Sequence, residues 1–331
     1  MSDTLFGLEM PDAGLDARLS ADMARVESEL RDAVASEDQF VADASRYLVE
    51  AGGKRFRPLL VLLAAQFGDP DAWGVVPAGV VVELTHLATL YHDDVMDEAQ
   101  LRRGAQSANA RWDNTIAILT GDFLFARSSR ILADLGPEAV RIQAHTFERL
   151  CTGQIRETIG PREGQDPVAH HLDVVADKTG SLIAASGRYG ALMAGAPEDV
   201  MEIMTQFGER IGVAFQLADD LVDITSESMQ SGKTPGTDLR EGIPTLAALV
   251  ALTSTDPADA RLQDLVSRPL PDDAEHAEAL ELLRAHSALD VARAEARRWS
   301  DLARECLEPL PPGSARDVLA LLCDYVVSRT G

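Results

Sequence analysis

Apolar residues recur at intervals of three and four along almost the whole chain, and no stretch sustains the alternation typical of a strand. This pattern predicts an all-α fold. The expected helices, in chain order, cover residues 21–34, 40–51, 55–67, 75–97, 114–135, 138–159, 168–195 and 198–224. A polar loop over 225–242 and several shorter helices are expected to complete the chain.

Glycine and proline, which disfavour helix interiors, mark the breaks between these helices. Examples are Gly52-Gly53, Gly136-Pro137 and the interruption at Thr179-Gly180. No repeat, low-complexity linker or change of composition marks a boundary, so residues 1–331 are expected to form a single helical domain. The segment 75–97 is apolar around its circumference, which predicts a place at the centre of that domain.

The chain carries 54 acidic and 30 basic residues, which gives a formal net charge of -24. Such a chain repels nucleic acid, and we therefore expect no nucleic-acid partner. It also repels anionic substrates unless Lys and Arg side chains or metal ions are concentrated locally. Basic clusters are therefore more informative here than acidic residues, most of which are expected to form a solvated surface.

The three cysteines, Cys151, Cys306 and Cys323, lie far apart and have no C-x-x-C spacing, which is typical of a reduced compartment. The N-terminal residues lack the basic and apolar regions of a secretory signal. The apolar stretches 75–82 and 243–252 are much shorter than the roughly 20 residues of a membrane-spanning helix. We expect a cytoplasmic protein without a transmembrane segment.

Two acidic clusters share the pattern D-D-x-x-D, and each lies near the end of a long apolar helix. They are Asp93-Asp94-Val95-Met96-Asp97 and Asp219-Asp220-Leu221-Val222-Asp223. At about 100° per residue, the first and last carboxylates of each cluster share a helix face. Their repulsion and their unfavourable position near a helix C-terminus each cost on the order of a few tenths to 1 kcal/mol. Mg²⁺ would remove this cost because it prefers carboxylate, water and phosphate oxygens. A solvated acidic face is the alternative for either cluster alone, whereas the pair favours a metal site.

Small cationic groups stand near expected helix ends or turns: Lys54-Arg55-Phe56-Arg57, Arg102-Arg103 and Lys233. Arginine offers a bidentate fork to phosphate oxygens and lysine a compact charge, so the mixture suits two diphosphate groups. Ordinary surface cations are the alternative. That alternative is weak for Arg102 and Arg103, which follow the first acidic cluster closely in an acidic protein.

Two polar residues on apolar helix faces allow two interpretations. His86 lies two turns before Asp93, and Gln216 lies one turn before Asp219. Each could be a hydrogen-bonded core residue or a contact to a bound anion. The residues alone leave both possibilities open.

Together, five motifs closely resemble the trans-isoprenyl diphosphate synthase family, and they occur in the same order and spacing. The motifs are GGKRFRP, HDDVMDEAQLRRG, KTG, FQLADDLVD and GKTPGTDLREG. The resemblance covers roughly residues 48–249. It implies an all-α bundle around a deep central cavity, usually assembled as a homodimer. Residues 243 and 247 differ from the residues most common at these positions in the family, and this difference affects only the expected conformation of the local loop.

By position, the resemblance implies a role for each matching residue. The expected ligands of isopentenyl diphosphate are Lys54, Arg57, His86 and Arg103. The expected ligands of the allylic diphosphate are Arg102, Lys178, Thr179, Gln216 and Lys233. Asp93 and Asp97 would share two Mg²⁺ ions, and Asp219 would hold a third. The catalytic set is expected to be Asp93, Asp94, Asp97, Lys178, Asp219, Asp220 and Asp223.

These residue types suit Mg²⁺-assisted ionisation of an allylic diphosphate, followed by attack of the isopentenyl double bond and loss of a proton. Metal ions and cationic side chains stabilise the departing pyrophosphate. No Ser-His or Cys-His pair is required. An apolar pocket between the helices would keep water from the carbocation.

Product length is expected to depend on how far the growing tail runs past the first aspartates. In this family, bulky aromatics four or five residues before the first aspartate shorten the product, and here those positions are Thr89 and Ala88. Ser128 and Ser129 are also small, and Ile131 or Leu132 would form a floor. In this respect the chain resembles the long-chain synthases, whose products have more than twenty carbons and serve as quinone side chains. The alternative is that the small residues only allow close helix packing.

Other functions fit these residues less well. A terpene cyclase or a head-to-head synthase would not need the second diphosphate site that Lys54, Arg57 and Arg103 indicate. An aromatic content of 5% is also modest for a cyclase pocket. A shorter-chain geranylgeranyl or farnesyl diphosphate synthase and a non-catalytic partner subunit remain as alternatives. The chain retains all the expected ligand residues, which argues against a non-catalytic partner subunit.

Overall fold

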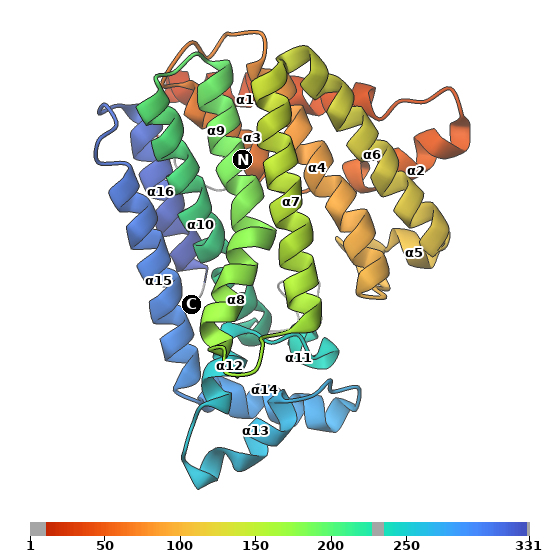
Figure 1. Cartoon of the computed structure of the whole chain (residues 1–331), viewed down its shortest axis with the longest axis vertical. Coiled ribbons are helices and arrows are strands. Elements are labelled where there is room, and N and C mark those ends of the chain that lie inside the picture. Colours follow the sequence, from red (N-terminus) through yellow and green to blue (C-terminus); the bar gives the residue numbers. More distant parts are fainter. Residues whose placement is uncertain (1–10, 227–234, 330–331) are drawn as a thin grey trace. The chain divides into compact units, whose positions relative to one another are not determined.

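The computed structural model describes residues 11–226 and 235–329 and is almost entirely α-helical within them, so the expected all-α class is confirmed (Figure 1). The helices are α1 (Ala13–Ala33), α2 (Gln39–Glu50), α3 (Phe56–Ala65), α4 (Val75–Met96), α5 (Ala108–Arg111), α6 (Asn114–Leu135), α7 (Pro137–Ile159), α8 (Pro167–Val175), α9 (Ser181–Met193), α10 (Glu198–Thr225), α11 (Thr237–Glu241), α12 (Leu246–Leu252), α13 (Ala260–Val266), α14 (Asp273–Ala285), α15 (Ala288–Cys306) and α16 (Ser314–Ser328).

The chain divides into two compact units, each described by itself. Unit 1 comprises the residues up to Phe147 together with Leu182–Gly208 and Cys306–Leu319. Unit 2 comprises Glu148–Ser181, Glu209–Glu305 and the residues from Ala320 onward. The expected single domain therefore remains a hypothesis.

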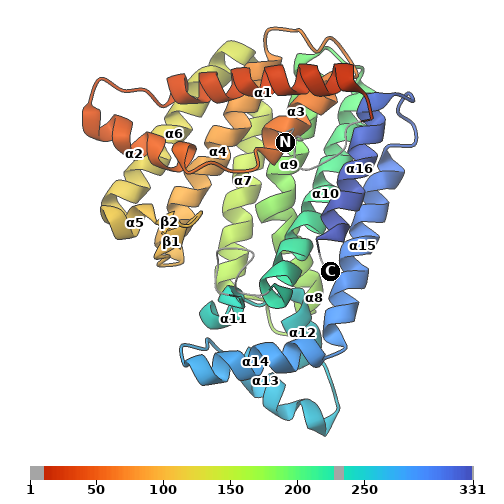
Figure 2. The same ribbon diagram turned by 180° about the vertical axis from the view of Figure 1, so that it is seen from behind.

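Helix α4 forms the core of unit 1 and packs against α1, α3 and α6 (Figure 2). Its residues Leu84, Leu87 and Tyr91 are fully buried, as expected for a helix that is apolar on nearly every side. The Tyr91 hydroxyl donates a hydrogen bond to the Ala44 carbonyl oxygen at 2.5 Å, so the buried phenol is satisfied. The helix that ends in the first acidic cluster is thereby held along its length.

Helix α1 begins at Ala13, eight residues before the start expected from the apolar pattern, so that expectation was wrong. Asp12 caps the helix because its carboxylate accepts from the backbone N–H groups of Gly14, at 2.7 Å, and Leu15, at 3.1 Å. The first turns carry little apolar periodicity, and the cap therefore determines where the helix begins.

Residues after α4 form a short antiparallel hairpin that the sequence pattern did not predict. Leu101–Arg102 (β1) pairs with Ala105–Gln106 (β2). The turn residues Arg103 and Gly104 have φ angles of 53° and 77°, which suit a two-residue hairpin turn. Strands this short have no detectable period of two, which is why the pattern did not predict them. The turn determines where the Arg102 and Arg103 side chains point.

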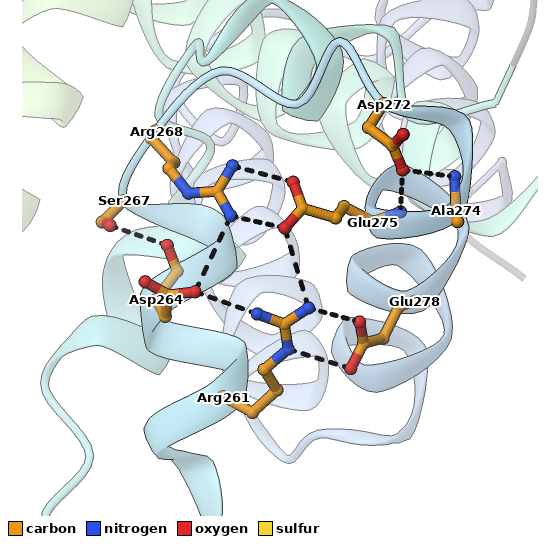
Figure 3. A network of polar contacts seen from close by, with 8 residues as sticks. All are labelled: Arg261, Asp264, Ser267, Arg268, Asp272, Ala274, Glu275 and Glu278. Atoms are coloured by element: carbon orange, nitrogen blue, oxygen red, sulfur yellow. Dashed lines mark hydrogen bonds and ion pairs between the residues drawn. The ribbon is translucent and has the colours of Figure 1, made fainter.

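Unit 2 has its own apolar core, to which α10, α12, α13, α14 and α15 contribute. On its surface, Arg261 of α13 pairs with Glu278 of α14, and Arg268, two residues after α13, pairs with Glu275 of α14 (Figure 3). Arg261 also pairs with Asp264 of its own helix. The Arg268 pair with Glu275 is bidentate, at 2.8 and 3.0 Å. Among the described residues, no helix combines the length and apolar character needed to cross a membrane.

Candidate active site

The first acidic cluster occupies the last turn of α4, in unit 1. The helix ends at Met96 with Asp97 as its C-terminal cap, and the Asp97 N–H donates to the Asp93 carbonyl oxygen at 2.8 Å. Asp93 is half-buried and Asp97 exposed, whereas Asp94 is completely buried. The cluster therefore presents two carboxylates one turn apart at the surface and directs the third inward.

Arg102 lies against this cluster. Its Nε donates to Asp94 Oδ1 at 2.5 Å, and its Nη2 lies 4.0 Å from Asp97 Oδ2. The other Asp94 oxygen, Oδ2, is buried and makes no hydrogen bond in the part of the chain that the structure describes. The hairpin thus brings an expected diphosphate ligand to the carboxylates, and Asp94 anchors it.

Basic residues also gather around His86, which is half-buried on α4. The pKa of His86 lies well below its ordinary value, first because of burial and then because Arg57, Arg103, Arg55 and Arg102 are positively charged nearby. Unit 1 therefore brings four of the expected diphosphate ligands, His86, Arg57, Arg102 and Arg103, into one positive region.

Arg103 is held by backbone carbonyls. Its Nη1 donates to the Leu48 oxygen at 3.0 Å and to the Gly52 oxygen. A Cβ on Gly53 would lie 2.9 Å from Arg103 Nη2, so glycine leaves room for the guanidinium. Lys54 is exposed on the same loop. The Gly-Gly pair that marks a helix break in the sequence thus also makes space for Arg103.

The second acidic cluster lies near the C-terminal end of α10, in unit 2. Gln216 Nε2 donates to Asp220 Oδ1 at 2.9 Å, and Thr179 Oγ1 donates to Gln216 Oε1 at 2.9 Å. Burial raises the pKa of Asp220 to about 7, with Asp219, Asp223 and Glu157 adding to the effect and the Gln216 hydrogen bond opposing it. The structure therefore links Thr179 to the cluster through Gln216.

Lys178 and Thr179 lie in a single π-helical turn, Ala176–Gly180, between α8 and α9. Such turns are rare and often occur at functional sites. Lys178 Nζ pairs with Glu157 Oε2 at 2.5 Å. Glu157 was missed by the sequence analysis because it is one of many acidic residues on the surface of a helix. The interruption expected at 179–180 is confirmed, although the chain stays helical through it.

Arg329 is a second residue that sequence reasoning missed. Its Nη2 lies 2.6 Å from Asp219 Oδ1, and its guanidinium stacks over the Phe215 ring at 5.0 Å. It lies outside every recognised motif, so no sequence signal marks it. Its contact shows that Asp219 attracts a cation.

His171 is the third missed residue. Its Nε2 lies 3.9 Å from Asp220 Oδ2, and burial lowers its pKa to about 4. Asp223 accepts from the Asp238 N–H at 3.2 Å, which connects α10 to α11. Lys233, an expected diphosphate ligand, falls outside the described residues.

The donor chemistry of both clusters fits a hard divalent cation. Each offers carboxylate oxygens, each has an arginine against it, and Asp94 Oδ2 has no hydrogen bond to satisfy its charge among the described residues. Within the described ranges, no three His, Cys, Asp or Glu side chains form a ready-made metal cage.

The small residues expected to line a tail passage differ in their surroundings. Ala88 is fully buried in the core cluster that includes Ala117 and Leu124 of α6. A Cβ on Gly121 of α6 would lie 3.1 Å from the Ala88 carbonyl oxygen, so the two helices approach closely there. Thr89 is only half-buried. Thr89 is therefore the better candidate for a tail contact.

On α6, Ser128 and Leu132 are buried in unit 1. Ser129 and Leu132 line a cleft of about 380 Å³ between α6 and α7, together with Phe125, Val140 and Phe147. The Ile131 side chain belongs to a different cleft, with Trp73 and Pro77. The two expected floor residues thus line separate clefts.

Known proteins resemble the chain over nearly its whole length. The polyprenyl synthetase family model matches residues 38–283. A nonaprenyl diphosphate synthase of Mycobacterium tuberculosis is 51% identical over 326 residues, covering 98% of this chain and 97% of the relative.

Two solved structures have a similar fold. Geranylgeranyl pyrophosphate synthase from Corynebacterium glutamicum, complexed with calcium and isoprenyl diphosphate, is 44% identical with a TM-score of 0.87 and covers 98% of this chain and 100% of that chain. A decaprenyl diphosphate synthase from Rhodobacter capsulatus is 34% identical with a TM-score of 0.87 and covers 96% of this chain and 98% of that chain.

Proposed function

Because this chain belongs to the polyprenyl synthetase family and is a prenyltransferase, we propose that it condenses isopentenyl diphosphate with an allylic diphosphate to make an all-trans polyprenyl diphosphate. The observation that carries the proposal is the positive region around His86 beside the carboxylates of α4. Within a protein of net charge -24, such a region has a clear use in binding an anionic substrate.

Asp93 and Asp97 would hold two Mg²⁺ ions, and Asp219, supported by Asp220 and Asp223, would hold a third. Bound Mg²⁺ supplies positive charge that stabilises the departing pyrophosphate. The carboxylates orient that charge because α4 and α10 are long helices fixed by their packing. Asp94 contributes through Arg102, whose guanidinium it holds at 2.5 Å.

Lys54, Arg57, His86 and Arg103 would bind the diphosphate of isopentenyl diphosphate. Arg102, Lys178, Thr179, Gln216 and Lys233 would bind the allylic diphosphate. The Glu157 carboxylate that holds Lys178 at 2.5 Å supports this assignment because it fixes the ammonium group beside the π-helical turn. The neutral imidazole of His86 would donate one hydrogen bond without adding repulsion among the arginines.

We propose a long-chain product, with more than twenty carbons, of the kind that serves as a quinone side chain. The half-buried Thr89 supports this length because no bulky side chain stands one turn before Asp93. The names of the nonaprenyl and decaprenyl relatives also support it. The geranylgeranyl synthase relative supports a shorter product as the second candidate.

A homodimer is the proposed assembly. Apolar side chains of α6 and α7 are exposed in unit 1, where Leu119 is 58%, Val140 45% and Ile118 43% accessible. Exposed apolar groups on adjacent helices favour burial against a partner. A cytoplasmic location is proposed from the cysteines, because Cys151, Cys306 and Cys323 lie far apart in the chain and have no C-x-x-C spacing.

The test incubates purified protein with Mg²⁺, labelled isopentenyl diphosphate and, separately, geranyl, farnesyl or geranylgeranyl diphosphate. Chromatography of the dephosphorylated products then gives the chain length. Asp93→Ala is expected to lower the rate at least about 100-fold, whereas the matched control Asp301→Ala, on an exposed part of α15, should retain it. Products that stop at fifteen or twenty carbons would favour the shorter-chain synthase. Absence of elongation with every primer would favour a non-catalytic partner subunit.

A further inference from the structure

Arg55 belongs to the cationic motif of unit 1, but its side chain is almost completely buried, at 6% accessibility. Its Nε donates to Glu27 Oε1 at 2.5 Å, and its Nη1 donates to Glu83 Oε1 at 2.8 Å. The guanidinium also donates to two backbone carbonyl oxygens, that of Gly52 at 3.2 Å and that of Val49 at 2.9 Å. The guanidinium is thus committed to protein acceptors, and a phosphate could reach it only by breaking these bonds.

The two carboxylates come from different helices. Glu83 lies on α4, one turn before His86, and is 2% accessible, whereas Glu27 lies on α1 and is 25% accessible. We call Glu27, Arg55 and Glu83 the buried triad. Because a buried charge is costly unless it is paired and hydrogen-bonded, each member of this triad depends on the others. The triad joins α1 and α4 to the loop that precedes α3.

That loop has an unusual backbone. Gly52 and Gly53 have φ angles of 82° and 141°, and Arg55 itself has a φ of 53°. A left-handed conformation is strained for a residue with a Cβ. The conformation persists when the surrounding contacts fix it. The two triad carboxylates accept one hydrogen bond each from Arg55, and the Gly52 and Val49 carbonyl oxygens accept two more.

We propose that the buried triad positions Lys54 and Arg57 for the diphosphate of isopentenyl diphosphate, with Arg55 and Glu83 as positioning residues that never touch the substrate. This inference rests on the proposed function. Lys54 and Arg57 flank Arg55 closely in the chain, so the direction in which each leaves the backbone follows from the conformation that the triad fixes. Glu83 links that loop to His86, because Glu83 and His86 both lie on α4.

Charge alone predicts the opposite effect of a substitution, which makes the proposal testable. The triad carries a net charge of -1. Burial lowers the pKa of Arg103, and the negative charge of the nearby Glu83 opposes that shift. If the triad acted only through its field, removing the Glu83 charge would make the region more positive and tighten diphosphate binding. If it acts by positioning, the same change loosens the loop and weakens binding.

The experiment compares Glu83→Gln with the wild-type protein by titration calorimetry with isopentenyl diphosphate and by steady-state kinetics. We expect the dissociation constant and KM for isopentenyl diphosphate to rise about tenfold or more. The KM for the allylic diphosphate and kcat at saturating isopentenyl diphosphate should stay within about threefold of wild type. The control Arg268→Gln breaks an exposed ion pair of unit 2 and should change none of these values.

Glu27→Gln provides a second variant in case Glu83→Gln does not fold, because Glu27 is partly exposed and its change is milder. It should raise the same KM in the same direction by a smaller factor. Unchanged or tighter isopentenyl diphosphate binding in a folded variant would overturn the proposal. If the wild-type protein itself neither binds nor elongates isopentenyl diphosphate, the proposed function fails instead, and the two failures are therefore distinguishable.

Discussion

His86 is expected to remain neutral across the physiological pH range in the free protein. Burial and the positive charges of Arg57, Arg103, Arg55 and Arg102 lower its pKa well below its ordinary value. The unfolded chain takes up a proton at this residue as the pH falls through about 6.5, whereas the folded chain resists it. Below that pH, His86 therefore lowers the free energy of unfolding, by at most about 1.4 kcal/mol for each pH unit.

Two measurements check this prediction. Denaturant titrations between about pH 7.5 and 5.5 should show a smaller loss of stability for His86→Gln than for the wild type. The imidazole NMR signal of His86 should not titrate in that window, and its pKa should rise when isopentenyl diphosphate adds negative charge nearby. A normal titration near pH 6.5 in the free protein would contradict the prediction.

At the scale of single residues, the sequence predicted which chemical groups matter better than it predicted their contacts. Repeated patterns with a clear cost, such as the two D-D-x-x-D clusters, stand out because stability alone disfavours them. Glu83, Glu157 and Arg329 leave no such signal, because an ordinary Glu or Arg on a helix gains its role only from a partner distant in the chain. Arg55 belongs to a cationic group that suits diphosphate binding, but the structure buries its side chain.

The packing of α4 against α6 predicts different effects for two neighbouring substitutions. Thr89→Phe is expected to fold and to shorten the product, because Thr89 is half-buried one turn before Asp93. Ala88→Phe is expected to lower the free energy of unfolding by about 1–3 kcal/mol or more, because Ala88 is fully buried where Gly121 brings α6 close. Thermal melts and product chromatography on both variants test this. A stable Ala88→Phe protein with a shortened product would place the tail on the α6 side instead.

Helices α3 and α9 approach so closely in unit 1 that Gly190 has no room for a side chain. A Cβ there would lie 2.1 Å from the Val61 carbonyl oxygen and 2.8 Å from Ala64 Cβ. Gly190→Ala should lower the free energy of unfolding by about 1–3 kcal/mol, even though alanine gains about 1 kcal/mol of helix propensity. Gly313→Ala is the control, since a Cβ on Gly313 would meet no other atom within 4 Å, and its effect should stay below about 1 kcal/mol. Equal effects in denaturant titrations would contradict the packing argument.

Whole elements followed from the sequence wherever apolar periodicity extended over several turns. Helices α4, α6 and α10 lie within one or two residues of their expected bounds. The start of α1 and the hairpin over Leu101–Gln106 did not follow, because a capping carboxylate and a two-residue turn determine them. Local hydrogen bonds decide such features, and a hydrophobic pattern does not record them.

At the scale of the molecule, helices continue from one compact unit into the other. The unit boundary at Phe147 falls inside α7, the one at Gly208 inside α10 and the one at Leu319 inside α16. Helix α7 has 23 residues and α16 has 15, so each part of either helix is too short to be stable alone, given that isolated helices shorter than about 12–15 residues are marginal. Unfolding either unit would therefore leave the other unit with shortened helices that are only marginally stable.

We consequently expect residues 1–331 to unfold as one cooperative domain. Scanning calorimetry at a fixed protein concentration should give one transition, with a calorimetric enthalpy equal to the van 't Hoff enthalpy. Gly190→Ala, which acts within unit 1, should move that whole transition to lower temperature. Two resolved transitions, with only one of them shifted by Gly190→Ala, would show instead that the units fold independently despite the helices that they share.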